Sequence, residues 1–442
     1  MPSQDYQWKR FWCPRSGRIN LADGGYLCDP EEKWGKIYNP DLVTFDAISD
    51  LPCLALLGEP GIGKSRALQA EKKQIISKIK QQGGQVHSLD DIRSFGSETR
   101  LVDKLFNSPQ FNEWLQGTHQ LHIFLDSFDE CLLRIDTLAT LLVDEFKSYR
   151  DQIKRLNLRI ACRTAVWQPV LEEGLKEIWG KDNVGIYELA PLRRIDVSQA
   201  AKIVGINDTE AFLEEINQKN VVPLAIKPIT FEFLIKTYHR HGSQFPPNQR
   251  LYELYSEGCL WLCEERNPNR LSSQLIVNLE RQKRLIIAAR IAAITIFGNK
   301  FAIWADTDWG DVPDEDVLIE KIYQGTESFD GRELEITRKT VKEVLDTGLF
   351  SSRGELSRMG WAHQTYAEFL AAWYLVQHET PLNQVMKLIV SPEDPERKLI
   401  PQLHETAAWL ASMRTDVLQE IMLILMYCCE ATYLQMQIFA QQ

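Results

Sequence analysis

An eight-residue segment of the chain has the residue types and spacing of a phosphate-binding loop. Its glycines permit backbone angles that turn successive N–H groups inward, and the start of a following helix adds partial positive charge. Lys64 would supply a charge for the β- and γ-phosphates of a nucleotide, and the Ser65 hydroxyl would bind Mg²⁺. The alternative is a glycine-rich turn that binds nothing. The segment fits G-x-x-x-x-G-K-[ST] and reads Gly58, Glu59, Pro60, Gly61, Ile62, Gly63, Lys64 and Ser65, with Arg66 directly after it.

Carboxylates after the apolar run Leu121–Leu125 supply the second half of such a site. Asp126 stands directly after the run, where it would hold Mg²⁺, and Asp129 or Glu130 would orient an attacking water. The alternative for this acidic pair is capping of a helix that begins near Cys131, because carboxylates favour a helix N-terminus.

A third charged residue, Arg163, follows the apolar run Leu158–Cys162. At the end of a strand it would lie on the sheet edge beside the γ-phosphate. The alternative is an ordinary solvated surface charge. Together the three segments predict a site that binds ATP or ADP with Mg²⁺.

These residues need a parallel sheet whose strands end at one edge. The run Leu54–Leu57 meets the glycine-rich loop, and Arg66–Gln81 has a helical pattern, so a strand, a loop and a helix follow one another. Further apolar runs are spaced for a parallel sheet with crossover helices, which predicts a doubly wound α/β domain ending near Leu192. They are Gln85–Leu89, Leu121–Leu125, Leu158–Cys162 and Val184–Leu189.

Beyond Leu192 the helical patterns dominate. Short helices are expected at Ser198–Ile203, Glu210–Gln218 and Ile229–Tyr238, with longer ones within 249–300. Residues 335–376 then favour a winged-helix domain. The expected order there is a helix at Thr337–Asp346, a strand at Leu349–Ser351, a turn at Gly354, a strand near Trp361, and a helix with Tyr366, Phe369, Leu370 and Trp373 on one face.

Two amphipathic helices within 395–424 would begin a helical repeat, and the apolar sequence after Glu420 suggests a truncated or frame-shifted repeat region. The expected division is a leader at 1–45, an α/β domain at 46–195, a helical domain at 196–260, a helical linker and winged-helix domain at 261–376, and partial repeats at 377–442.

The charge, apolar stretches and cysteine content of the chain exclude several classes of function. The 442 residues include 61 acidic and 50 basic ones, and the net charge of −11 makes non-specific nucleic-acid binding unlikely. The N-terminus lacks the features of a secretory signal, and the longest apolar stretch, 285–297, is too short to span a membrane, so a cytoplasmic protein is expected. Nine scattered cysteines signal no disulfide framework. Cys259 and Cys263 with His239 or His241 have metal-ligand types, but free cysteine is more often a small buried apolar residue.

The chain resembles the NACHT branch of the STAND P-loop NTPases, signal-transduction ATPases with numerous domains, and is most similar to bacterial NACHT proteins of antiviral defence. The match covers about residues 50–376. The segments that carry it are the loop GEPGIGKS, the strand end FLDSFDE with its small residue after the aspartate, the strand end IACRT, which looks like a sensor arginine, and the stretch 360–372, GWAHQTYAEFLAA.

The resemblance implies roles for two further residues. His363 would contact the β-phosphate of ADP and latch the winged-helix domain over the nucleotide; the alternative is a histidine at a helix start. Pro228 would pack on adenine, with Pro223 as runner-up, although either proline could simply start a helix.

The resemblance also implies an activity. The chain would be a slowly hydrolysing ATPase that acts as a switch: ADP holds a closed monomer, and Mg-ATP opens it and exposes a homo-oligomerisation surface, with unknown trigger and effector proteins. Two alternatives are a turnover ATPase that remodels a protein or nucleic acid, and a scaffold that holds nucleotide without hydrolysis.

Overall fold

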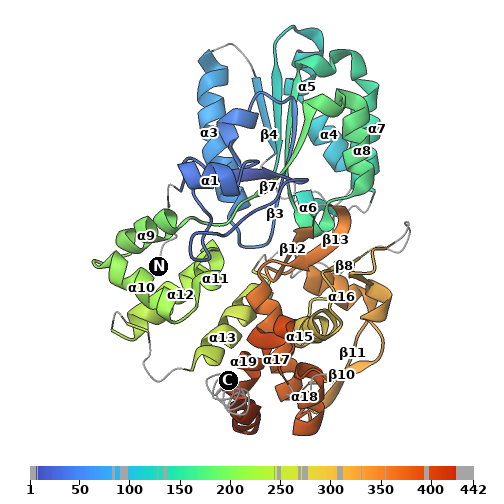
Figure 1. Ribbon diagram of the computed structural model, residues 1–442. Helices are drawn as coiled ribbons and strands as arrows, with labels where there is room; N and C mark the ends of the chain where they lie inside the picture. Colours follow the sequence, from blue (N-terminus) through green and yellow to red (C-terminus); the bar gives the residue numbers. More distant parts are fainter. Residues whose placement is uncertain are drawn as a thin grey trace, which may run out of the picture. The chain divides into compact units, whose positions relative to one another are not determined.

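The apolar run at the phosphate loop forms β3 (Cys53–Gly58), in which every residue is buried. In this computed structural model β3 lies in the middle of a seven-stranded sheet ordered β2-β1-β7-β3-β6-β5-β4 (Figure 1). The other expected strands run parallel to it and to one another, so the prediction of a parallel α/β core is confirmed. They are β4 (Gln85–Leu89), β5 (Leu121–Leu125), β6 (Leu156–Arg163) and β7 (Val184–Leu189).

Helices cover both faces of this sheet, which is why β3 is apolar at successive positions. Cys53, Ala55 and Leu57 pack in one core with the helices after β4, whereas Leu54 and Leu56 pack in the other with α3. The helices are α3 (Lys64–Gln81) on one face and, on the other, α4 (Glu98–Leu105), α5 (Pro109–Gln116), α6 (Phe128–Leu132), α7 (Leu138–Ser148) and α8 (Pro169–Trp179).

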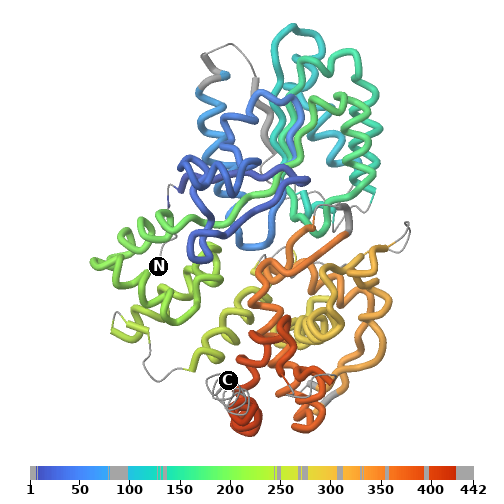
Figure 2. The backbone as a smooth tube through the Cα atoms, viewed as in Figure 1, coloured from blue at the N-terminus to red at the C-terminus, as the bar shows by residue number. Residues whose placement is uncertain are grey.

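The leader adds two antiparallel strands to this sheet, and the sequence analysis did not predict them. β1 (Phe11–Pro14) pairs with β7, and β2 (Val43–Thr44) pairs with β1; Figure 2 traces this blue segment beside the sheet. Four and two residues are too few to show a period of two. The leader also contains α1 (Lys33–Tyr38) and α2 (Phe45–Ile48).

Helices follow the sheet, as expected, and they belong to the same compact unit as the sheet. They are α9 (Arg194–Ile203), α10 (Thr209–Gln218), α11 (Val222–Ala225) and α12 (Pro228–Arg240), of which α11 was not expected. This first unit comprises residues 1–247 together with 264–278 and 345–358, and the last of these segments contains β12 (Phe350–Arg353).

The second unit comprises 248–263, 279–344 and 359–442, and α15 packs in it against α17, which packs against α19. Its helices are α13 (Leu251–Cys263), α15 (Arg281–Phe297), α16 (Arg338–Leu345), α17 (Gln364–Gln377), α18 (Leu382–Ile389) and α19 (His404–Met413). Its strands are β8 (Ala302–Trp304), β9 (Asp316–Leu318), β10 (Thr326–Phe329), β11 (Arg332–Glu335) and β13 (Glu355–Trp361), which begins in the first unit.

The order helix, strand, strand, helix expected at 335–376 is present as α16, β12, β13 and α17. The expected pair of helices within 395–424 is present as α19 and the helical residues 415–424, whereas α18 was not expected. The winged-helix, repeat and leader assignments stay predictions. The turn at Gly354 and all but residues 421–424 of the segment after Glu420 lie outside the described residues, so the truncation stays a prediction.

Short 3₁₀ helices complete the chain at Arg150–Arg155, Thr164–Val166, Lys181–Asn183, Ile319–Lys321 and Pro401–Leu403. No helix in the described part of the chain is long and apolar enough to cross a membrane. The structure describes residues 6, 8–81, 85–89, 98–126, 128–132, 137–242, 244–245, 250–266, 270, 277–305, 312–329, 331–353, 355–392 and 398–424.

Candidate functional site

The phosphate loop has the backbone that its glycines predict. Gly61 and Gly63 adopt φ angles of +76° and +99°, a region that residues with a Cβ rarely enter. A Cβ on Gly61 would also lie 2.6 Å from Ile229 Cγ2, in the first turn of α12. Gly61 therefore needs glycine both for its backbone angle and for its close contact with α12.

Lys64, the first residue of α3, folds over this loop. Its Nζ donates hydrogen bonds to the carbonyl oxygens of Gly58 and Glu59. Burial lowers the pKa of Lys64, and the nearby carboxylate of Asp129 opposes that shift. The ammonium thus lies inside the loop, among acceptors that a phosphate group would replace.

Ser65 and Asp126 come together although the sequence separates them widely. Ser65 Oγ lies 3.5 Å from Asp126 Oδ1, at the point where β5 ends beside the start of α3. A hydroxyl and a carboxylate are the oxygen ligands that Mg²⁺ uses at phosphate sites. The pair therefore fits the predicted magnesium position.

Arg163 and Asp129 form a buried ion pair, with Arg163 Nε 3.0 Å from Asp129 Oδ2. Arg163 is 9% exposed, so the alternative of a solvated surface charge is wrong. The alternative for Asp129 was that it caps a helix beginning near Cys131. The helix, α6, begins instead at Phe128, three residues earlier. Asp129 lies in the first turn of α6, and the side chain of Glu130 falls outside the described residues.

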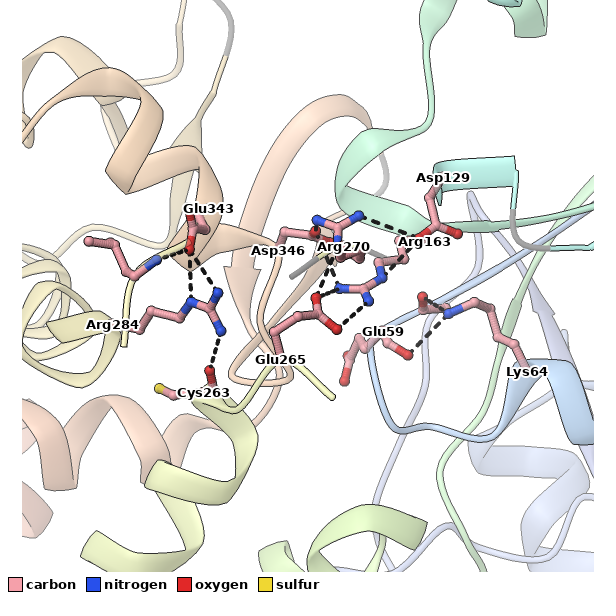
Figure 3. A network of polar contacts seen from close by, with 12 residues as sticks. Glu59, Lys64, Asp129, Arg163, Cys263, Glu265, Arg270, Arg284, Glu343 and Asp346 are labelled. Atoms are coloured by element: carbon pink, nitrogen blue, oxygen red, sulfur yellow. Dashed lines mark hydrogen bonds and ion pairs between the residues drawn. The ribbon is translucent and has the colours of Figure 1, made fainter. Parts of the chain in front are cut away.

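Three carboxylates surround the Arg163 guanidinium (Figure 3). Besides Asp129, Glu265 Oε2 lies 3.0 Å and Asp346 Oδ2 3.4 Å from Arg163 Nη1. Burial alone would lower the pKa of Arg163, but Asp346, Asp129 and Glu265 together raise it above its ordinary value. Sequence reasoning missed Glu265 and Asp346, which follow no strand and match no motif.

The phosphate loop, Asp126, Asp129 and Arg163 line a cavity of about 1130 Å³, a size suited to a small-molecule ligand. Its lining joins the carboxyl edge of the sheet to the first turn of α12. The lining includes the predicted residues Glu59, Pro60, Gly61, Gly63, Lys64, Ser65, Arg66, Asp126, Asp129, Arg163 and Pro228. The other two residues of the loop, Gly58 and Ile62, are not part of the lining, and Ile62 is only 2% exposed.

The leader supplies cavity residues that the sequence analysis did not single out. Tyr6 and Trp8 stack with ring centroids 4.6 Å apart, and both line the cavity. Arg10 Nη1 donates to the carbonyl oxygen of Ile62, and burial lowers the pKa of Arg10 to about 10. The signal in the sequence that could have identified Arg10 is its position next to the aromatic residues Trp8 and Phe11, which favour burial.

Of the two candidate prolines, only Pro228 reaches the cavity lining. Pro228 is the first residue of α12, whereas Pro223 is buried within α11. The preceding residue, Lys227, forms an ion pair with Glu59 of the loop and donates to the carbonyl oxygen of Gly348 at 2.6 Å. Lys227, directly before α12, therefore holds the phosphate loop in place through Glu59.

Glu188 of β7 is a half-buried acid whose charge interacts with Glu59 of the phosphate loop. Burial raises the pKa of Glu188 to about 7, an effect that the charge of Arg15 partly offsets. Its Oε1 is enclosed and has no hydrogen-bond partner among the residues that the structure describes. Such a group is protonated more easily in the folded chain than in the unfolded one.

His363 lies in the second unit, where it caps α17. Its Nδ1 accepts a hydrogen bond from the backbone N–H of Thr365 at 3.2 Å. The histidine therefore does start a helix, as the alternative supposed, and its contact with a β-phosphate stays a prediction.

The cysteine pair at one helical turn behaves as core. Cys259 and Cys263 are buried on α13, and burial raises the pKa of both thiols. The described ranges contain no group of three or more His, Cys, Asp or Glu that could hold a metal ion, so these two cysteines form no such site with His239 or His241.

Comparison with solved structures finds distant likenesses. The chain is 16% identical to PCH-2 of C. elegans over 49% of its own length, spanning 62% of that chain, with a TM-score of 0.29. It is 14% identical to a Walker-type ATPase of Pyrococcus abyssi, over 80% of this chain and 98% of that one, with a TM-score of 0.36. No protein-family model and no curated protein matches the chain. At these scores the likenesses assign neither family nor activity, and the geometry of the site carries the interpretation.

Proposed function

We propose that the chain binds Mg-ATP and Mg-ADP and hydrolyses ATP slowly, as a P-loop ATPase. One observation carries the proposal: a glycine loop, a lysine, a hydroxyl and a carboxylate converge at the carboxyl edge of a parallel sheet. The distance that summarises it is the 3.5 Å between Ser65 Oγ and Asp126 Oδ1. Ligands of open α/β sheets bind at this edge.

Each residue would have a distinct part. The N–H groups of 61–65 would hold the phosphates, Lys64 would neutralise the β- and γ-phosphates, and Ser65 with Asp126 would hold Mg²⁺. Bound Mg²⁺ would neutralise charge on the phosphate oxygens. Pro228 and the stacked Tyr6 and Trp8 would offer apolar surface to the base.

Slow hydrolysis is supported by the engagement of Asp129. A carboxylate that orients a water needs an oxygen free to accept its proton or hydrogen bond. Asp129 Oδ2 lies 3.0 Å from Arg163 Nε and 3.5 Å from Arg270 Nη1, which leaves Oδ1 as the oxygen for a water. The two guanidinium groups also withdraw charge from this carboxylate and make it a weaker base, which favours a nucleotide-controlled switch over a turnover ATPase that remodels a protein or nucleic acid.

We further propose that this switch is of the STAND type, with the NACHT resemblance placing it in defence against phage or foreign elements. ADP would hold a closed monomer and Mg-ATP a homo-oligomer that acts on effector proteins after a trigger. A nucleotide moves such an equilibrium only through unequal affinity for the two states, and the γ-phosphate is the group that differs.

The test is the nucleotide content and turnover of the purified full chain, with assembly state measured in parallel by mass analysis. A switch retains ADP through purification, turns over slowly, and changes mass when a non-hydrolysable ATP analogue replaces ADP. Rapid turnover from an empty site, with one mass in both nucleotides, would instead establish the turnover ATPase.

A further inference from the structure

Arg163 occupies the strand between the phosphate loop and the magnesium carboxylate. In the sheet, β6 lies between β3 and β5, and Arg163 pairs in register with Gly58, the first residue of the loop. A guanidinium at this position is within the cavity that the phosphate loop lines. Besides Lys64, it is a second positive charge placed to meet the terminal phosphate of a bound nucleotide.

Every nitrogen of this guanidinium already has a carboxylate partner. Nε faces Asp129, Nη1 faces both Glu265 and Asp346, and Nη2 donates to Glu265 Oε1 at 3.1 Å. These contacts take four of the five N–H donors of the guanidinium, which leaves one N–H on Nη2 for a phosphate. A γ-phosphate that takes two hydrogen bonds from Arg163 must therefore displace a carboxylate.

A second arginine closes the cluster. Arg270 Nε lies 2.9 Å from Glu265 Oε2, and its Nη2 is hydrogen bonded to Asp346 (Figure 3). No side chain of the five is more than 10% exposed, and the three carboxylates exceed the two guanidinium groups by one negative charge. A γ-phosphate that approaches Arg163 meets these carboxylates with little water to screen their charge.

We propose that Glu265 and Asp346 compete with the γ-phosphate for Arg163 and thereby set the selectivity of the site between ATP and ADP. The inference rests on the proposed nucleotide site and deepens it. ADP lacks the γ-phosphate and leaves the cluster intact, whereas the γ-phosphate of ATP must displace a carboxylate to form a bidentate contact with Arg163. Glu265 and Asp346 are positioning residues in this account, since they act through the arginine.

Displacement of a carboxylate from Arg163 would also affect two segments at which the chain passes from one unit to the other. Glu265 and Asp346 stand in the segments 264–278 and 345–358, and each segment is flanked in the chain by residues of the second unit. Replacement of a carboxylate by phosphate at Arg163 would free these segments from α6 and β6. The cluster thus gives a physical route by which the terminal phosphate changes the chain outside the nucleotide site.

The experiment measures the dissociation constants of Mg-ADP and a non-hydrolysable Mg-ATP analogue by calorimetry on the same preparation. The test variant is Glu265→Gln with Asp346→Asn, and the matched control, which removes two exposed carboxylates elsewhere, is Glu173→Gln with Asp182→Asn. We expect the test variant to bind the ATP analogue roughly tenfold more tightly, with ADP affinity nearly unchanged, because the neutral amides hold Arg163 less strongly than the carboxylates do. Partial misfolding lowers the bound fraction of both nucleotides and leaves this ratio unaffected.

A third variant separates competition from a general charge effect. Adding Arg163→Gln to the test variant should abolish the gain for the ATP analogue, since nothing remains for the carboxylates to release. A ratio unchanged in the test variant, or a gain that persists without Arg163, would overturn the inference while leaving the nucleotide site intact. Failure of the unaltered chain to bind either nucleotide would overturn both the site and the inference.

Discussion

Ser65 and Asp126 are 61 positions apart in the sequence, yet Ser65 Oγ and Asp126 Oδ1 lie 3.5 Å apart at the carboxyl edge of the sheet. The contact exists because α3 begins after β3 and the phosphate loop while Asp126 follows β5, with β6 between the two strands. A magnesium ion would be held at this junction and would share its charge with bound phosphates.

Asp126→Asn should therefore weaken nucleotide binding only when magnesium is present. We expect the affinity for Mg-ADP to fall roughly 10- to 100-fold, the range seen when groups that support a metal are removed. Titration calorimetry with Mg²⁺ and with a chelator measures the effect. Asp182→Asn, at an exposed position before β7, is the matched control. Equal losses with and without magnesium would place the ion elsewhere.

Gly61→Ala should destabilise the first unit more than a glycine replacement in open space. Both Gly61 and Gly205 have positive φ, which costs about 1–2 kcal/mol for a residue with a Cβ. Only at Gly61 does the added Cβ also meet a neighbour within 4 Å, the side chain of Ile229, and overpacking costs about 1–3 kcal/mol more. Urea unfolding compares the two variants. Equal losses of unfolding free energy would show that the loop does not pack on α12.

Glu188 makes stability depend on pH. The pKa of Glu188 is about 7 in the folded chain and 4.5 as the ordinary value, so folding favours the protonated acid. Its contribution to the free energy of unfolding is therefore full below pH 4.5 and is lost as the pH rises through 7. The difference corresponds to about 3 kcal/mol. Glu188→Gln should flatten the fall in unfolding free energy between pH 5 and 8, measured by urea denaturation, whereas the exposed Glu173→Gln should not. A fall of unchanged size in Glu188→Gln would mean that another group titrates.

Two substitutions at His363 separate a latch from a helix cap. Asn retains an acceptor for the N-terminus of α17, whereas Ala removes it at a cost of about 1 kcal/mol. The latch predicts faster ADP release from both variants, measured by displacement of a fluorescent ADP. The cap alone predicts a stability loss in His363→Ala and unchanged release in both.

The parts of this account that the sequence predicted are local patterns. The run at Leu54–Leu57 and the loop up to Ser65 read directly as a strand, a phosphate loop and a helix start, because the glycines and apolar positions lie within a few residues of one another. β1 was not predicted because four residues are too few to show the alternation of apolar and polar side chains that marks a strand. Its pairing with β7 depends on the other strands being in place.

The environment of Arg163 was beyond the sequence for a different reason. Glu265 and Asp346 are 102 and 183 positions from Arg163, and neither stands at a strand end or in a motif. The sequence placed a charge at the end of β6 and left open whether water or protein surrounds it. Only the folded chain supplies the carboxylates that bury it.

The central claim is that a magnesium nucleotide binds at the loop of Lys64, and titration of Mg-ATP analogue and Mg-ADP into the full chain tests it most directly. Lys64→Ala should lower both affinities at least roughly tenfold, because charge-assisted hydrogen bonds to the phosphates are lost. Lys181→Ala, at the opposite edge of the sheet before β7, should bind as the unaltered chain does. Binding that is absent from the unaltered chain, or that survives intact in Lys64→Ala, would contradict the account.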